Sequence, residues 1–189
     1  MFPSHDRKVE GQERDAYKAL GVNKVVWIEA IPEVYHRLLN NLQGYDNQMA
    51  IHALCSDKEE KVTFNIANNG QSSSMLELGT HKEVHPEVSY VSKIELQAIR
   101  VDQIDYDFEG LDFLNIDVQG AELKVLEGMG DLLNQFKYIY LEVNWRELYV
   151  GCPLIGDLDN FLKGFKRVAA KQCGNTGWGD GFWIRDDLR

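Results

Sequence analysis

The chain has 189 residues, 44% of them hydrophobic, which is enough to bury a core without disulfide staples. Its 30 acidic and 20 basic residues give a net charge of -10 at pH 7, which argues against nucleic acid as a partner because phosphate backbones are bound by clustered Lys and Arg. No apolar segment is long enough to span a bilayer, and three cysteines outside any metal-binding spacing indicate reduced thiols in a cytoplasmic protein. We expect a single domain over residues 1–189.

The first part of the chain alternates apolar runs with a helical pattern. Residues 24–30 form a short apolar run that ends near Glu29 and predict a buried parallel strand. Residues 32–42 have helical spacing, and 49–56 predict the next strand, which closes on Asp57. The apolar face expected for the helix comprises Val34, Leu38, Leu39 and Leu42.

Two segments with partial alternation follow. Residues 61–67 and 93–101 alternate apolar and polar side chains in part, as half-covered or antiparallel strands do. The segment between them, 68–88, is rich in Asn, Gly and Ser near its start and predicts a loop with one helical turn.

The rest of the chain continues the alternation of strand and helix. We expect strands at 111–118 and 138–144, helices at 120–133 and 154–165, the latter closed by Gly164, and a final antiparallel strand pair at 166–173 and 179–187. This order predicts the α/β class, with a mostly parallel sheet, helices on both faces and an antiparallel C-terminal pair.

Acidic residues stand at the ends of four expected strands: Glu29, Asp57, Asp117 and Glu142. In a doubly wound sheet, ligands bind outside the carboxyl ends of the strands, so these acids would share one rim. The alternative is that they cap helices or lie in solvated loops, since Asp and Glu favour the first turns of helices. A negative rim suits S-adenosylmethionine (SAM), which carries ribose hydroxyls, an ammonium and a sulfonium. No glycine-rich phosphate-binding motif is present.

The segments "DFLNIDVQGAELKVLEGMGDLL" and "IYLEVNWRELYVGCPLIGDLDNFLKGF" strongly resemble the FkbM family of SAM-dependent methyltransferases. The upstream pieces "VVWIEAIPE", "ALCSD" and "NNGQSSSML" are similar to the same family in order and spacing, so the resemblance covers roughly residues 11 to 186. It implies a Rossmann-like class I methyltransferase fold and transfer of a methyl group from SAM to a hydroxyl of a small molecule or glycan.

The resemblance also implies roles for individual residues. Asp117 and Glu142 would be the catalytic carboxylates. Gln119 and Glu122 would orient the loop that follows Asp117. Cofactor contacts are expected from Gly11, Glu29, Ala30, Ser56, Asp57, Asp117 and Gln119, and substrate contacts from Ser73, Ser74, His81, Glu122 and Asn144. Two metal sites are conceivable, one at His81 and His85 and one at Asp117, Glu142 and Asn144, but we expect no metal.

The sequence departs from the family pattern at its start. Such methyltransferases open with a full first strand and a glycine-bearing turn, whereas here we expect a first strand that is short or missing and a degenerate or truncated cofactor-binding turn at residues 1–17. Either "PSHDRK" is a worn version of that turn, or Gly11-Gln12 is its last part. Two alternatives to an active enzyme therefore stay open: an inactive Rossmann-like binding module, and a subunit completed by a partner chain or by its own copy in a homodimer.

Overall fold

The structure, a computed structural model, describes residue 11 and residues 13–189. The chain divides into two compact units, Met1–Leu54 and Cys55–Arg189. The single domain expected over residues 1–189 stays a prediction, and the expected first strand and most of the degenerate turn lie outside the described residues. Among the described residues, no helix has both the length and the apolar character needed to cross a membrane.

The first unit contains a two-stranded parallel sheet. Strand β1 (Val25–Glu29) pairs in parallel with β2 (Gln48–His52), and helix α2 (Pro32–Asn41) forms the crossover between them. These elements confirm the expected parallel strand and the helix, because parallel neighbours need a crossover connection. The expectation that this strand is buried was wrong: none of its residues is buried, and Ile28 is 37% exposed. A short helix, α1 (Arg14–Ala19), precedes β1. The apolar face expected for α2 was wrong at Leu39, which is 40% exposed, whereas Leu38 is buried.

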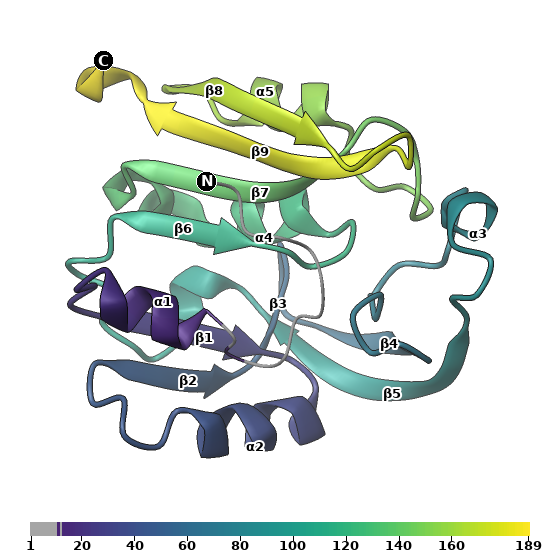
Figure 1. Cartoon of the computed structure of the whole chain (residues 1–189), viewed down its shortest axis with the longest axis horizontal. Coiled ribbons are helices and arrows are strands. Elements are labelled where there is room, and N and C mark those ends of the chain that lie inside the picture. Colours follow the sequence, from purple (N-terminus) through teal and green to yellow (C-terminus); the bar gives the residue numbers. More distant parts are fainter. Residues whose placement is uncertain (1–10, 12) are drawn as a thin grey trace. The chain divides into compact units, whose positions relative to one another are not determined.

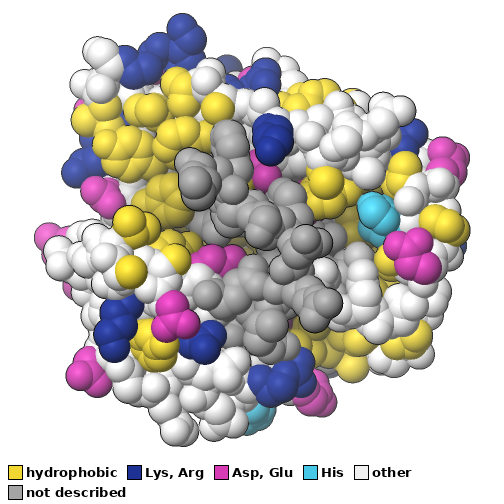
Figure 2. Space-filling model, viewed as in Figure 1, with side chains coloured by type: hydrophobic (Ala, Val, Ile, Leu, Met, Phe, Trp, Pro, Cys, Tyr) yellow, Lys and Arg dark blue, Asp and Glu magenta, His cyan; other side chains and the backbone are white. Residues whose placement is uncertain are grey.

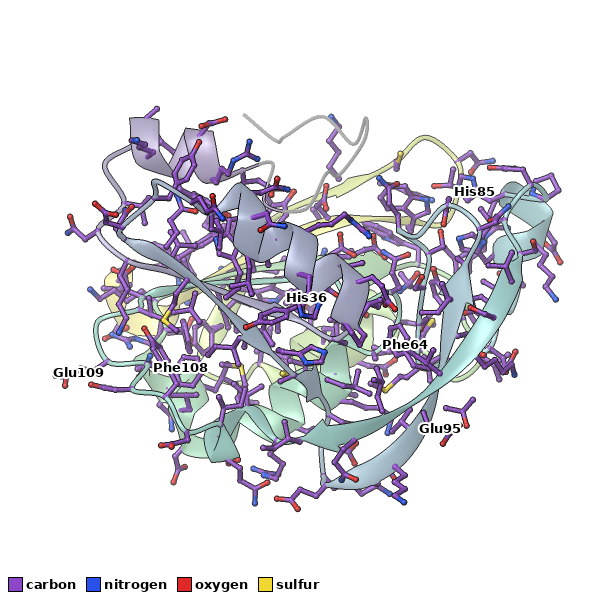
Figure 3. All side chains as sticks on the ribbon, turned by 90° about the horizontal axis from the view of Figure 1, so that it is seen from below. His36, Phe64, His85, Glu95, Phe108 and Glu109 are labelled. Atoms are coloured by element: carbon purple, nitrogen blue, oxygen red, sulfur yellow. The ribbon has the colours of Figure 1, made fainter. Side chains whose placement is uncertain are left out.

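A curved antiparallel arm begins the second unit. Strands β4 (Glu60–Ala67) and β5 (Tyr90–Ile99) pair antiparallel, as their alternation predicted, in a sheet of order β3-β5-β4. In Figure 3 the labelled Phe64 points inward and Glu95 projects outward, which agrees with the burial of Phe64 and the exposure of Glu95. The single strand expected at 49–56 was wrong: it is divided into β2 and β3 (Leu54–Cys55), with Ala53 between them.

A four-stranded sheet forms the rest of the second unit, in the order β6-β7-β9-β8 (Figure 1). Only β6 and β7 are parallel, whereas β9 pairs antiparallel with both β7 and β8. The α/β class and the antiparallel C-terminal pair are thus confirmed, but the expectation of a mostly parallel sheet was wrong, because the described sheets are mixed. The reason is that β4 and β5, and likewise β8 and β9, are neighbours of opposite direction and therefore need no crossover helix. The bounds are β6 Phe113–Ile116, β7 Tyr138–Asn144, β8 Phe165–Gln172 and β9 Trp178–Arg185.

The helices of the second unit are shorter than the sequence pattern predicted. The expected helix at 120–133 ends at Met129, because Gly130 has a φ of 50° and the chain continues as a 3₁₀ helix. The helix expected at 154–165 ends at Phe161, three residues before Gly164. The helical turn expected within 68–88 is confirmed. The helices are α3 His81–Val84, η1 Val101–Gln103, α4 Glu122–Met129, η2 Gly130–Gln135, α5 Ile155–Phe161 and η3 Asp186–Leu188.

The two faces of the four-stranded sheet differ in chemistry. Side chains alternate between the faces of a strand, so Ile139, Leu141 and Val143 of β7 share one face. All three are fully buried, and so is Trp183 of β9. On the opposite face β7 carries Tyr138, Tyr140, Glu142 and Asn144. The apolar face forms part of the core, whereas the polar face positions the candidate site.

Candidate functional site

A tight turn follows β6 and carries Asp117 and Gln119. Gln119 has a φ of 56°, in the left-handed region that a residue other than glycine rarely adopts, and Gly120 follows with a φ of 96°. The backbone amides of Val118 and Gly120 donate to Glu122 Oε1, at 3.2 and 3.1 Å. Glu122 is fully buried, and these bonds fit the expected loop-orienting role better than contact with a substrate.

The carboxamide of Gln119 joins two of the expected catalytic residues. Its Nε2 atom donates to Asp117 Oδ1 at 2.6 Å and to both carboxylate oxygens of Glu142 at 3.0 Å. Asp117 comes directly after β6, and Glu142 lies on the neighbouring parallel strand β7. Two carboxyl groups from adjacent strands therefore accept hydrogen bonds from one neutral amide nitrogen.

The loop rich in serine reaches the same turn. Ser74 Oγ donates to the backbone carbonyl of Gln119 at 2.8 Å, and Ser74 is fully buried. Ser73 Oγ instead donates to the carbonyl of Gly70 at 2.7 Å and accepts the Ala67 amide at 3.0 Å. Of the two expected substrate serines, Ser74 thus contacts the candidate site, whereas the bonds of Ser73 hold its own loop.

Tyr149 completes the surroundings of Gln119. Its hydroxyl donates to Gln119 Oε1 at 2.6 Å, and its ring lies against Gly120, where an added Cβ atom would come within 2.9 Å of Tyr149. Burial raises the pKa of Tyr149 above its usual range, and the Glu142 carboxylate adds to this effect. The tyrosine therefore keeps its proton and acts as a donor.

Strand β9 brings a third carboxylate to the polar face. Asp180 pairs directly with Glu142 in the antiparallel register, and only 5% of its surface is exposed. Burial raises the pKa of Tyr140, and the Asp180 carboxylate contributes to the shift. Opposed residues of antiparallel strands share a face, so Asp180 belongs to the candidate site although sequence reasoning did not identify it.

Asn144 ends β7 on the same face as Glu142. It pairs with Trp178 of β9 and is fully buried. Neither polar atom of its side chain has a hydrogen-bond partner within the part of the chain that the structure describes. Since a buried amide without partners is costly, Asn144 remains a sound candidate for contact with a polar substrate group.

His81 lies at the start of α3 and packs against the site from the loop side. Its ring centroid is 5.3 Å from that of Tyr149 and 5.1 Å from that of His85. Burial lowers the pKa of His81 to about 4, and repulsion from His85 adds to the shift. His81 is therefore neutral at pH 7. The structure places it against Tyr149, one contact away from Gln119.

Ser56 and Asp57 belong to a different cluster. Asp57 Oδ1 accepts bonds from Ser56 Oγ at 2.9 Å and from Lys124 Nζ at 3.1 Å, and Arg100 donates to the Asp57 carbonyl at 3.0 Å. Partial burial raises the pKa of Asp57, but the bonds from Ser56 and Lys124 outweigh it and leave that pKa below its usual value. Lys124 of α4 and Asp57, which follows β3, thus form an ion pair.

The remaining expected cofactor residues lie in the first unit. Glu29 ends β1, and its Oε1 accepts the Ile31 amide at 2.7 Å. His52 Nε2 lies 3.1 Å from the carbonyl of Ala30. Gly11 is buried with a φ of 69°, and its carbonyl accepts the backbone amide of Arg14 at 3.0 Å. The shared rim expected for the first-unit and second-unit acids stays a prediction.

Metal binding was the main alternative chemistry for these groups. Among the described residues, no group of three or more His, Cys, Asp or Glu side chains could hold a metal ion.

Lys and Arg side chains lie at several separate places on the face in Figure 2, with acidic side chains between them.

Sequence comparisons identify the family of the chain. The Methyltransferase FkbM domain matches residues 9–175. The 2-O-methyltransferase NoeI of Sinorhizobium fredii (strain NBRC 101917 / NGR234) is 28% identical over 151 residues, which cover 75% of this chain but only 62% of that relative. No solved structure matches the chain significantly. With a domain match over most of its length, the chain belongs to the FkbM methyltransferase family.

Proposed function

We propose that the protein is a SAM-dependent O-methyltransferase that acts on a hydroxyl group of a small molecule or glycan. The observation that carries this proposal is the pair of carboxylates, Asp117 and Glu142, held by one nitrogen of Gln119 at the ends of adjacent parallel strands. Family membership supports methyl transfer, and the name of the relative NoeI supports an oxygen acceptor.

The acidic side chains at the candidate site fit the positive charge of the proposed cofactor. Asp117, Glu142 and Asp180 gather negative charge on one face, which favours a cation nearby. SAM would supply a methyl group on a positively charged sulfur and would leave as a neutral thioether. Glu29, at the end of β1, is the candidate partner of the ribose hydroxyls.

The chain's own part in the reaction is to place and deprotonate the acceptor. The hydroxyl oxygen gains the methyl carbon and loses its proton, so a base must stand beside it. Asp117 or Glu142 would accept that proton, because Gln119 holds both carboxylates as acceptors. Asn144 and His81 are the candidates for contact with the rest of the acceptor.

The first experiment is cofactor binding by isothermal titration calorimetry with SAM and with its demethylated product. We expect both to bind, and Glu29→Ala to weaken binding by ~1–3 kcal/mol through loss of charged hydrogen bonds. Glu33→Ala, which changes an exposed acid of α2, is the matched control and should bind normally. Unchanged affinity in Glu29→Ala would place the ribose elsewhere.

The second experiment is transfer of labelled methyl from SAM to a panel of hydroxylated acceptors. Label in an ether linkage would support the proposal. A chain that binds neither SAM nor its product would instead be a binding module or a subunit completed by a partner. Light scattering identifies a subunit completed by its own copy, because such a subunit cannot remain a monomer.

A further inference from the structure

The side chain of Gln119 has a single orientation that satisfies its neighbours. Its Oε1 accepts the Tyr149 hydroxyl at 2.6 Å, while its Nε2 donates to Asp117 and Glu142. Ionised carboxylates only accept hydrogen bonds, so a rotated amide would set its oxygen against two negative groups. A tyrosine hydroxyl can donate or accept, and with Nε2 facing the carboxylates it donates to Oε1 and holds the amide at that end.

Tyr149 is itself held from several sides. Only 1% of its surface is exposed, its ring packs on Gly120, and the ring of His81 lies 5.3 Å away. The Ser72 hydroxyl opposes the rise in the pKa of Tyr149 that burial causes, and it accepts a bond from Asn69 at 3.0 Å. The packing of the ring on Gly120 and His81 therefore holds the Tyr149 hydroxyl beside Gln119.

The backbone of Gln119 is fixed independently of its side chain. Ser74 Oγ holds its carbonyl at 2.8 Å while φ stays at 56°. A left-handed conformation in a residue other than glycine costs free energy and persists only where the surroundings impose it. Backbone and carboxamide are thus both constrained by the serine loop and Tyr149, neither of which needs to touch the reacting groups.

We infer that Tyr149 is a positioning residue for methyl transfer: by fixing the carboxamide of Gln119, it keeps the carboxylates of Asp117 and Glu142 in place to take the proton of the acceptor hydroxyl. This inference rests on the proposed function. It assigns Tyr149 no contact with cofactor or acceptor, so its loss should slow the reaction and spare binding.

The test compares Tyr149→Phe with Tyr90→Phe. The Tyr90 hydroxyl donates to the Leu76 carbonyl at 2.7 Å in the same region, so its removal also deletes one half-buried hydroxyl but removes no hydrogen bond of the Gln119 carboxamide. We expect kcat of Tyr149→Phe to fall about tenfold or more, the effect of losing one directing hydrogen bond. The KM for SAM and the KM for the acceptor should stay within about twofold, and Tyr90→Phe should keep its kcat.

A second variant guards against an unfolded Tyr149→Phe. Gln119→Asn keeps a residue type that tolerates the left-handed backbone but shortens the amide, so kcat should fall similarly. The double variant should lose no more than Gln119→Asn alone, since both changes remove the same contact. Full additivity, or a Tyr149→Phe enzyme as fast as Tyr90→Phe, would overturn the inference.

A measurement without turnover separates the inference from the proposed function. In a ¹⁵N-labelled protein, Tyr149→Phe should shift the side-chain NH₂ signals of Gln119, whereas Tyr90→Phe should not. Unmoved signals would refute the positioning role whether or not the wild type transfers methyl groups. A wild type without SAM binding would refute the proposed function alone.

Discussion

Two acids that follow strands of the second unit, Asp57 and Asp117, have different surroundings. Asp57 accepts bonds from the Lys124 ammonium and the Ser56 hydroxyl, so its charge is balanced by a neighbouring cation. Asp117 shares the neutral Gln119 amide with a second carboxylate, Glu142. A position at a strand end is common to both, but only the shared amide gathers negative charge. We therefore expect Asp57 to stabilise the fold and Asp117 to serve the reaction.

The largest expected effect is on methyl transfer by Asp117→Asn. The variant keeps the shape of the side chain but removes the charge and the basic oxygen, so kcat should fall about 10²- to 10⁴-fold, the range for loss of a general base. The melting temperature should remain close to that of the wild type. Steady-state kinetics and thermal melts measure the two quantities. Normal turnover in a folded variant would contradict this role of Asp117 and would indicate that Glu142 is the base.

The sequence could predict the polar ends of the strands but not all of their partners. Strand β7 was expected at 138–144 and lies there, because its run of apolar residues has no other interpretation, and Asp117 follows β6 as expected. Asp180 was missed since its role depends on the register between β9 and β7. No local pattern encodes a pairing across nearly forty residues, as between Asp180 and Glu142.

The ends of several helices and strands also could not be predicted from the sequence pattern. The helical spacing of 120–133 continues past Met129, yet the left-handed φ of Gly130 ends the α-helix. The run 49–56 is mostly apolar and contains neither Gly nor Pro, so no turn residue marks the break at Ala53. Tyr149 is buried like a core residue, but its hydroxyl bond to Gln119 could be found only in three dimensions.

Gly128→Ala is expected to destabilise the fold close to Asp57, where α4 approaches Ser56. Gly128 lies in α4, and an added Cβ atom would stand 2.0 Å from the carbonyl oxygen of Ser56. Overpacking of this kind should lower the free energy of unfolding by about 1 to 3 kcal/mol. Gly156→Ala in α5, where no atom lies within 4 Å, is the matched control and should stabilise by up to about 1 kcal/mol. Chemical denaturation of both variants decides the point, and equal stabilities would contradict the close approach of α4 to Ser56.

A third titratable group, His81, is buried beside Tyr149. Its pKa of about 4 in the folded protein lies below the ordinary value near 6.5, because burial and His85 disfavour the charged form, although Glu87 opposes them. The unfolded chain therefore binds the proton first, and stability falls as the pH drops from about 6.5 to 4. Compared with His81→Phe, which keeps an aromatic ring against Tyr149, the wild type should lose about 2 kcal/mol more between pH 7 and pH 5. Parallel pH dependences of unfolding would show that His81 titrates normally.

The smallest effect is expected from Asp57→Asn. The ion pair with Lys124 is partly exposed, and such pairs contribute about 0 to 1 kcal/mol. The lowered pKa of Asp57 means that this contribution is present above pH 4 or so and is lost as the pH falls through the folded-state value. The stability difference between wild type and variant should therefore shrink in acid and in high salt, and SAM affinity should stay within about twofold. A large loss of SAM affinity with unchanged stability would reverse the comparison, since Asp57 would then belong to the cofactor site and its bond to Lys124 would be incidental.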